Sequence, residues 1–304
     1  MGRGSHRIAR SSQAKGARVN TDLHDAIERH RRGPWSPTAV PRLTLVSIEK
    51  PIGQADQIYE PMICFVARGS KNSVAGDLRW RTRAGDVLLN SLAMPVTAMF
   101  EELPYRSAVL QLDARVLSEL LLELGPSVPV TADPPDARNS MTMTPEIVDA
   151  VTRLVRLLDT PDDIPALAGR VEGEILYRLL ASPLGPALRH WARTDTAAAR
   201  IRAVASWIIG HHAEPLSIDG LAAIAHMSPA SLHRHFKAAT GMSPLRFQKQ
   251  LRLQEARRRL VAGDLTAAEV AAAVGYASAT QFNREYRRFY GLPPVQDTIR
   301  LRAG

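Results

Sequence analysis

Residues 221–244 read LAAIAHMSPASLHRHFKAATGMSP, and residues 270–294 read VAAAVGYASATQFNREYRRFYGLPP. The two stretches are nearly the same sequence written twice. At an offset of fifty residues, the matched positions include Ser228 with Ser278, Arg234 with Arg284, Gly241 with Gly291 and Pro244 with Pro294. Each copy combines a short apolar helix, a tight turn and a second helix that is basic on one face. This combination is typical of a helix-turn-helix, and two copies in tandem predict a DNA-binding protein.

The second helix of the first copy begins with the residues that start helices. Ser228 is a favourable N-cap, and Pro229 suits the first turn because its missing N–H would have no partner there. Such a helix fits the major groove, where an arginine can bond guanine through two hydrogen bonds. The predicted base contacts are Ala230, Ser231, His233 and Arg234, and the predicted phosphate contacts are Ser228 and Lys237.

The second copy gives a parallel prediction. Ser278 is its N-cap, and Phe282 and Tyr286 fall at core-facing spacings. The predicted base contacts are Ala279, Thr280, Asn283 and Arg284, and the predicted phosphate contacts are Ser278, Arg287 and Arg288. A helix over 243–262 joins the two copies, so both recognition helices are expected to enter successive major grooves, about 34 Å apart. The arginines of this joining helix are expected either to be exposed or to cover apolar surface with their stems.

The distribution of charge supports a polyanionic partner. The chain has 304 residues and a net charge of +9. Residues 197–304 carry 15 basic and 7 acidic side chains, whereas residues 34–196 carry 16 basic and 20 acidic ones. The excess positive charge therefore lies on the segment that holds the repeat, where it attracts DNA without sequence preference and in a salt-dependent way.

The N-terminal half has a different pattern. Between 42 and 112 the chain breaks into short apolar or alternating runs separated by Gly, Pro and Asn, which indicates strands of a small antiparallel barrel or sandwich. Helical spacing follows from residue 114, and the segments 146–158 and 164–181 predict a helical hairpin or a subunit interface. The expected class is thus α+β, with a β-domain followed by an all-α domain. The expected divisions are a basic, disordered arm over 1–33, an effector or dimerisation domain over 34–182, a junction over 183–197 and a DNA-binding domain over 198–304. Within the arm, disorder is expected over 1–20 and a short helix over 21–31.

The inventory of reactive side chains argues against catalysis and metal binding. Residues 34–189 contain no histidine, so a metal-binding barrel is not expected, and neither is any other cofactor. Cys64 is the only cysteine, which excludes an intramolecular disulfide and fits a reducing cytoplasm. It is interpreted either as a small buried hydrophobe or as a reactive sensor thiol. The candidate effector-binding residues are Tyr59, Cys64, Phe65 and Trp80.

Residues 198–302 resemble the C-terminal domain of the AraC/XylS family of bacterial transcription regulators. The resemblance rests on the double motif, on GMSP and GLPP after the recognition helices, and on the joining helix; the ending PPVQDTIR departs from the usual Pro-x-x-Tyr-Arg pattern. The segments YEPMICFVARG, RTRAGDVLLNS and LAMPVTAMF resemble the cupin-like N-terminal domain of one AraC-type branch. The resemblance implies binding of DNA through both units, action on RNA polymerase, and a barrel that binds a small effector or forms a dimer.

The expected function is that of a cytoplasmic, sequence-specific transcription regulator without enzymatic activity. No apolar run reaches the roughly 18 residues of a membrane helix, so no membrane partner is expected. The sequence is compatible with a homodimer and with a monomer that binds DNA through both motifs of one chain. Two alternatives come from other classes: a non-specific nucleoid protein, and a DNA-repair protein that accepts alkyl groups on Cys64.

Overall fold

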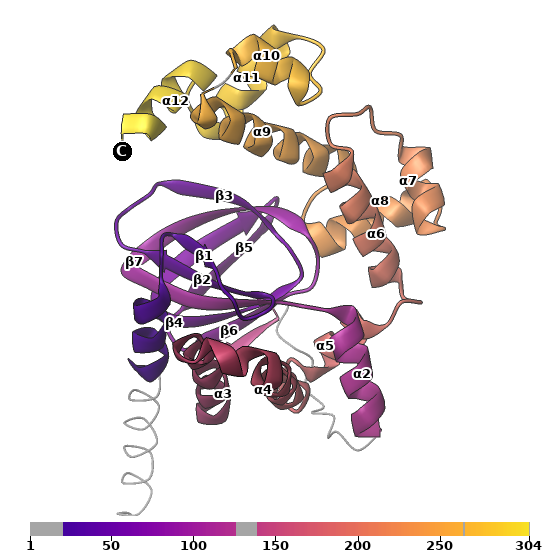
Figure 1. Cartoon of the computed structure of the whole chain (residues 1–304). Coiled ribbons are helices and arrows are strands. Elements are labelled where there is room, and N and C mark those ends of the chain that lie inside the picture. The colour runs from indigo at the N-terminus through magenta and orange to yellow at the C-terminus, as the bar shows by residue number, and fades with distance from the viewer. Residues whose placement is uncertain (1–20, 126–138, 264, 304) are drawn as a thin grey trace, which may run out of the picture.

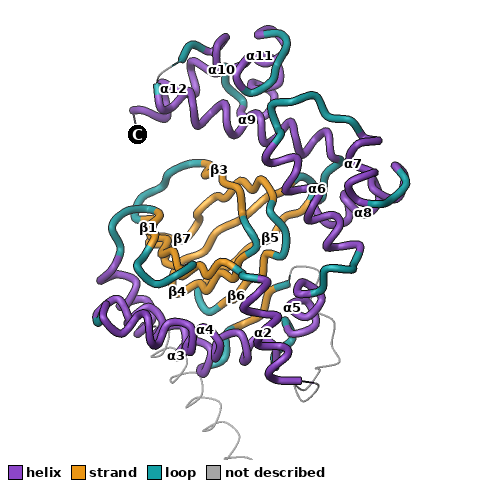
Figure 2. Tube along the Cα trace, turned by 45° about the vertical axis from the view of Figure 1, so that its right-hand side comes forward, coloured by secondary structure: helices purple, strands orange, loops and turns teal. Residues whose placement is uncertain are grey.

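The computed structural model describes residues 21–125, 139–263 and 265–303. A β-domain with a helical layer beneath it forms the N-terminal half, and a curved arrangement of helices lies over the opposite end of the sheet (Figure 1). The tube trace shows the same division, with the strands gathered in one curled sheet and the helices outside it (Figure 2). This α+β architecture confirms the fold class predicted from the sequence.

One antiparallel sheet contains all the described strands. Its main order is β1-β2-β7-β4-β6-β8, while β3 pairs with β7 and β5 pairs with β4. Two long strands, β4 and β7, pair along most of their length and bend the sheet through irregular register between Val66 and Lys71. The strands are β1 (Trp35–Pro37), β2 (Leu43–Ile48), β3 (Gln54–Tyr59), β4 (Met62–Ala75), β5 (Leu78–Arg83), β6 (Asp86–Asn90), β7 (Met94–Gln111) and β8 (Ser140–Thr142).

The two faces of this sheet pack against different partners. Along β4, Ile63 and Phe65 lie in a core shared with the helical layer, whereas Cys64 and Val66 lie in a second cluster on the inner face. This is the alternation that a strand imposes on successive side chains. The helical layer consists of α2 (Ala114–Leu124), α3 (Pro145–Arg156), α4 (Ile164–Leu180) and α5 (Gly185–Ala192). It confirms the helices predicted over 146–158 and 164–181.

Two of the predicted divisions contain residues that pack in the core of the N-terminal domain. Residues 21–30 of the predicted arm form a helix, where the sequence predicts one over 21–31, and Leu23 and Ile27 are fully buried in the core between the sheet and the helical layer. Residues 1–20 of that arm lie outside the described residues. In the predicted junction, Leu188 and Trp191 of α5 are buried in the same core. Most of this segment therefore belongs to the N-terminal domain, because its apolar residues have a core to fill.

The second half is helical, as the sequence predicts. Its helices are α6 (Ala197–Gly210), α7 (Ile218–Ala225), α8 (Pro229–Thr240), α9 (Pro244–Ala262), α10 (Ala267–Ala273), α11 (Ala279–Tyr290) and α12 (Pro294–Ala303). The predicted N-caps Ser228 and Ser278 both accept a hydrogen bond from the backbone N–H three residues on. The first motif, α7–α8, packs with α6 in one cluster, and the second motif, α10–α11, packs in another.

Helix α9 joins the two helix-turn-helix motifs and crosses over the β-domain, where it contacts β7 (Figure 1). Its docking stripe is polar: Gln250 Nε2 donates to the carbonyl of Pro95, and Gln254 Nε2 donates to the carbonyl of Val96, both at 3.4 Å. Arg257 extends the stripe by one more turn and is 5% exposed. It was expected to be exposed or to snorkel, so its burial in an ion-pair cluster is a correction. The cluster contains Asp56 of β3 and Asp297 of α12.

Among the helices of the described segments, none has the length and apolar character that crossing a bilayer requires.

Candidate DNA-binding surface and barrel pocket

The second helix of each motif presents its predicted DNA contacts to solvent. On α8, Ala230, His233, Arg234 and Lys237 are exposed, whereas Leu232 and Phe236 are buried beneath them. Ser231 is only partly buried, and its N–H donates to the Ser228 hydroxyl. The burial pattern thus leaves a free face on α8 that is basic and lined by small side chains, as a groove-reading helix needs.

Helix α11 repeats this arrangement. Its exposed residues include all the predicted contacts, Ala279, Thr280, Asn283, Arg284, Arg287 and Arg288, together with the cap Ser278. Phe282 and Tyr286 are fully buried and stack edge to face. The two recognition helices lie toward opposite ends of α9 (Figure 1). The hydroxyls of Ser228 and Ser278 cap their helices, so any phosphate contact there uses groups already engaged in capping.

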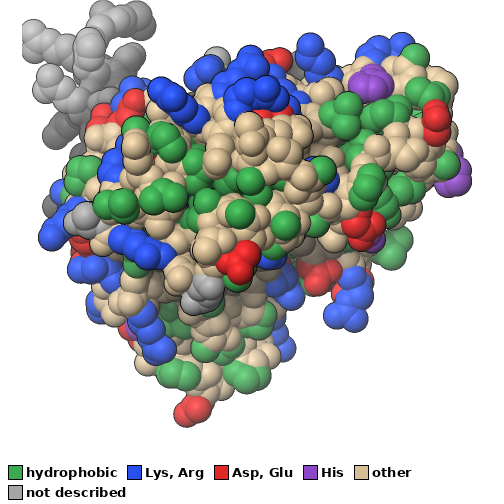
Figure 3. Space-filling model, turned by 90° about the horizontal axis from the view of Figure 1, so that it is seen from above, with side chains coloured by type: hydrophobic (Ala, Val, Ile, Leu, Met, Phe, Trp, Pro, Cys, Tyr) green, Lys and Arg blue, Asp and Glu red, His purple; other side chains and the backbone are tan. Residues whose placement is uncertain are grey.

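A basic groove adds two side chains that the sequence analysis missed. Arg246 and Lys249 of α9 line a cavity of about 560 Å³ together with Arg284 and Arg288 of α11. Seen from above, lysine and arginine side chains crowd along one edge of the molecule (Figure 3). Arg246 and Lys249 lie on the helix that the sequence analysis predicted as a connector, so they were not considered as DNA contacts. A comparison of the α9 positions that face α11 would have identified them. We include them in the candidate phosphate-binding surface.

The two motifs are held against each other by direct contacts. Arg252 of α9 donates to the carbonyls of His212 at 2.6 Å and Glu214 at 2.9 Å, which follow α6 in the first unit. It also donates to the carbonyl of Gly275 at 2.8 Å, which is in the turn of the second unit. Gly275 has φ +88°, and a Cβ there would lie 2.1 Å from the carbonyl oxygen of Ala213. One arginine and one glycine therefore fix the orientation of the two recognition helices.

Substitution of Gly275 by alanine is expected to lower the free energy of unfolding by about 2–5 kcal/mol, because left-handed backbone strain adds to the clash with Ala213. Gly291 is a matched control, since its φ is +81° but nothing lies within 4 Å of the position that a Cβ would take there. Gly291→Ala should cost only the strain, about 1–2 kcal/mol. Urea unfolding of both variants measures the difference. Equal losses would mean that the approach to Ala213 is not what requires a glycine.

The β-domain also contacts the end of the first recognition helix. The turn between β4 and β5 packs on the residues that cap α8, where the Asp77 N–H donates to the carbonyl of Gly241 at 3.1 Å. The Asp77 carboxylate accepts from Arg246 at 2.6 Å, and this hydrogen bond lowers the pKa of Asp77. The first DNA-binding unit is therefore seated on the barrel both through its core and at this turn.

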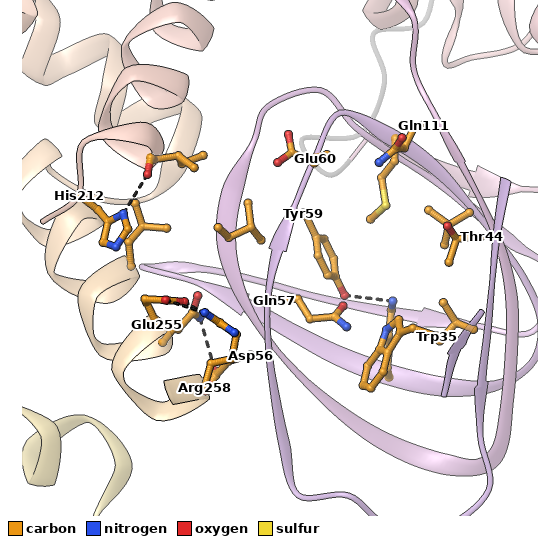
Figure 4. Close-up of a pocket in the computed structure, with 18 of the residues that line it drawn as sticks. Trp35, Thr44, Asp56, Gln57, Tyr59, Glu60, Gln111, His212, Glu255 and Arg258 are labelled. Atoms are coloured by element: carbon orange, nitrogen blue, oxygen red, sulfur yellow. Dashed lines mark hydrogen bonds and ion pairs between the residues drawn. The ribbon is translucent and has the colours of Figure 1, made fainter. Parts of the chain in front are cut away.

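The inside of the curled sheet holds the second candidate site, a pocket of about 540 Å³. The close-up shows Trp35, Thr44 and Gln111 on the barrel side and His212, Glu255 and Arg258 on the helical side, with Tyr59 and Gln57 between them (Figure 4). The helical domain therefore lines the mouth of a pocket whose body lies within the barrel. A molecule that fills it would touch both halves of the chain.

Only one of the four candidate effector residues lines this pocket. Tyr59 does so. Phe65 packs in the core against the helical layer, because it lies on the other face of β4. Cys64 is 0% exposed, and its Sγ lies 3.8 Å from the Tyr105 hydroxyl. Trp80 packs against two clusters, the one on the inner face of the sheet that contains Cys64 and the one that contains the first motif. A buried thiol is out of reach of a DNA base, which argues against alkyl transfer to Cys64.

The ionisable groups at the mouth of the pocket are largely paired. Glu255 accepts from Arg258 at 2.7 Å and from Arg259 at 2.6 Å, and these hydrogen bonds lower the pKa of Glu255 to about 2. Asp56 pairs with Arg257 at 2.9 Å. Burial raises the pKa of Glu60. In the described chain, no group of three histidine, cysteine, aspartate or glutamate side chains is arranged to hold a metal ion.

Comparison with family models assigns both halves of the chain. Residues 39–187 match the model of the AraC-type transcriptional regulator N-terminus, and residues 221–297 match a helix-turn-helix domain. The two matches cover most of the barrel and its helical layer, and nearly all of both DNA-binding motifs.

Two relatives agree with this assignment, and one solved structure shares the fold. The chain is 33% identical over 94 residues to the HTH-type transcriptional activator RhaS of Pectobacterium atrosepticum, covering 31% of this chain and 34% of that protein. It is 30% identical over 151 residues to RhaS of Escherichia fergusonii, covering 49% and 52%. The matches thus span from about a third to half the length of these relatives. The fold is similar to that of a point variant of apo ToxT from Vibrio cholerae, with a TM-score of 0.50, 11% identity and coverage of 88% and 99%.

Proposed function

Because the chain belongs to the AraC-type transcriptional regulators, we propose that it binds specific DNA sequences and regulates transcription, and that its N-terminal barrel binds a small effector. The observation that carries this proposal is the pair of exposed, basic recognition helices held at fixed orientation on one connecting helix. Arg234 and Arg284 occupy equivalent, exposed positions on α8 and α11.

The candidate DNA surface divides into base-reading and phosphate-binding parts. Arg234 and His233 in the first unit, and Arg284 and Asn283 in the second, have the donors and acceptors that read base edges in the major groove. Lys237, Arg287 and Arg288, together with Arg246 and Lys249 of the groove, are positioned for phosphates. Both sets are required, because phosphate contacts set register and affinity while base contacts set the sequence.

The effector and partner roles follow from the position of the pocket. An effector in the barrel would contact α9, which holds both recognition helices, so it could favour one arrangement of the halves over another. RNA polymerase is the expected downstream partner, and the protein would act in the cytoplasm, where the genome lies. Homodimerisation is proposed through the helical layer, where α4 exposes Leu167 and Tyr177 away from the core.

Selection of bound fragments from genomic DNA by the full chain is the test of this proposal. We expect a recurrent sequence with two half-sites, bound more tightly than random duplex by on the order of 10³ or more. Competition binding at fixed salt measures the ratio, because the non-specific part depends steeply on salt concentration. Equal binding of selected and random duplexes would instead identify a nucleoid-type protein.

A further inference from the structure

A lysine side chain lies inside the barrel where no acidic partner balances it. Lys71 of β4 is 4% exposed and lines the pocket. Its ammonium donates to the Tyr59 hydroxyl at 3.1 Å, the bond drawn at Tyr59 in the close-up (Figure 4), and lies 5.2 Å from the ring centres of Tyr59 and Tyr105. These contacts are all with tyrosines, and no carboxylate among the described residues forms an ion pair with Lys71.

The absence of a counter-charge among the described residues is unusual for a buried ammonium. Charged groups removed from water are generally paired, because their desolvation costs several kcal/mol. Two other pairs at the pocket follow that rule, because Arg258 pairs with Glu255 and Asp56 pairs with Arg257. Glu60, the remaining carboxylate that lines the pocket, is exposed to solvent and forms no ion pair with Lys71 among the described residues. The ring faces of Tyr59 and Tyr105 compensate a cation only in part, by about 0.5–2 kcal/mol each. The Lys71 ammonium therefore lies inside the pocket without an ion-pair partner among the described residues.

We propose that the barrel binds an organic acid with an apolar body, whose carboxylate is held by Lys71. This proposal deepens the effector role proposed above and rests on it. An ammonium has three N–H donors, and Tyr59 takes one, so two remain for a ligand anion. Thr44 and Gln111, which also line the pocket, can add neutral hydrogen bonds.

The remainder of the pocket sets the rest of the ligand's chemistry. Val46, Ile58, Phe100 and Val109 give it apolar walls, and its volume of about 540 Å³ admits a molecule the size of an aryl-substituted short-chain acid. At the helical end, Gln254 Oε1 and His212 Nε2 are buried and have no hydrogen-bond partner among the described residues. A polar substituent at the end opposite to the carboxylate would meet these two groups, so the ligand would bridge Lys71 and the helical domain.

Binding of matched acids and amides to the full chain tests the proposal. The probes are 3-phenylpropanoate and 3-(4-hydroxyphenyl)propanoate, each compared with its primary amide, which has the same shape and no charge. Binding is followed by calorimetry and by tryptophan fluorescence, to which Trp35 of the pocket contributes. The acids are expected to bind and the amides to bind at least tenfold more weakly, as for the loss of a charge-assisted hydrogen bond.

The variant Lys71→Met removes the ammonium while keeping an unbranched side chain that is only one atom shorter. It should bind the acids on the order of ten- to a hundredfold more weakly than the parent chain. It should also melt at a higher temperature in the absence of ligand, because an unbalanced buried charge is removed. Tyr59→Phe is the control, since it removes the hydrogen bond to Lys71 but keeps the charge, and it should still prefer acids to amides.

Three results would overturn the proposal: equal binding of acid and amide, absence of binding by either acid at millimolar concentration, or a Lys71→Met protein that fails to fold or melts below the parent chain. The last result would make Lys71 a structural group. Operator preference is measured on the same samples. It should persist in Lys71→Met, so loss of the acid site and loss of the DNA-binding function are distinguishable.

Discussion

Replacing Arg234 and Arg284 by alanine together is expected to lower the affinity for the selected operator by on the order of 10²–10⁴, while binding to random duplex falls far less. Each arginine is exposed at the same position of its recognition helix and makes no ion pair among the described residues, so its guanidinium is free for a guanine edge. A bidentate contact of this kind contributes about 1–3 kcal/mol of discrimination. Fluorescence anisotropy against specific and random duplexes at one salt concentration measures both values.

A second variant separates base reading from charge. Arg115→Ala with Arg170→Ala also removes two positive charges, but both residues are exposed on α2 and α4 of the helical layer, away from the recognition helices. This control should leave the ratio of specific to random binding unchanged. If the Arg234 and Arg284 variant kept its preference for the operator, α8 and α11 would not be the base-reading helices.

The helical domain could be predicted closely because its signals are local. Capping serines, Pro229 in the first turn and glycines after the recognition helices each act through a few neighbouring residues. The repeat then fixed which face is buried, since the same spacing of apolar residues occurs twice. For this reason the predicted exposure of Arg234 and Arg284 agrees with the structure.

The pocket could not be predicted because it depends on strand irregularities. In a regular strand, side chains alternate between the two faces, so Lys71 would lie on the face opposite to Cys64 and Val66 and thus outside the barrel. The register of β4 against β7 shifts between Val66 and Arg68, between Arg68 and Ser70, and again between Ser70 and Lys71. Each shift changes which face the following side chain occupies. Nothing in the local sequence fixes such shifts, so the position of Lys71 inside the barrel could not be inferred from it.

The docking of α9 was missed for a related reason. Gln250, Gln254 and Arg257 are polar, and polar residues on a helix usually indicate a solvent face. Their partners are backbone carbonyls of β7 and the Asp56 side chain, about 150–200 positions away in sequence. Asp297, which departs from the usual family ending, is the other partner of Arg257. The partners are distant in sequence, so composition alone gave no reason to bury an arginine.

Arg257→Met is expected to lower the free energy of unfolding by about 3–5 kcal/mol, the loss typical of breaking a buried ion pair. The guanidinium bonds Asp297 and Asp56, each at 2.9 Å, and lies 4.3 Å from the centre of the Tyr290 ring. Arg258→Met is the matched control, because Arg258 is the next residue on the helix and its side chain is 70% exposed. An exposed pair contributes at most about 1 kcal/mol. Similar losses in urea unfolding would contradict the assigned role of Arg257.

Separate substitutions of the two partners of Arg257, Asp297 and Asp56, should produce two distinct effects. Asp297 is 0% exposed and also accepts from the Tyr286 hydroxyl at 2.9 Å, so Asp297→Asn acts within the second DNA-binding unit. Asp56 lies on β3, so Asp56→Asn weakens the contact between barrel and α9 while the bond from Arg257 to Asp297 remains. Hydrogen exchange should then increase in α11 and α12 for Asp297→Asn, but along the facing surfaces of β3 and α9 for Asp56→Asn. If both variants loosened the same amides, the cluster would stabilise one cooperative body, and the barrel could not change its contact with α9 without disturbing the second recognition helix.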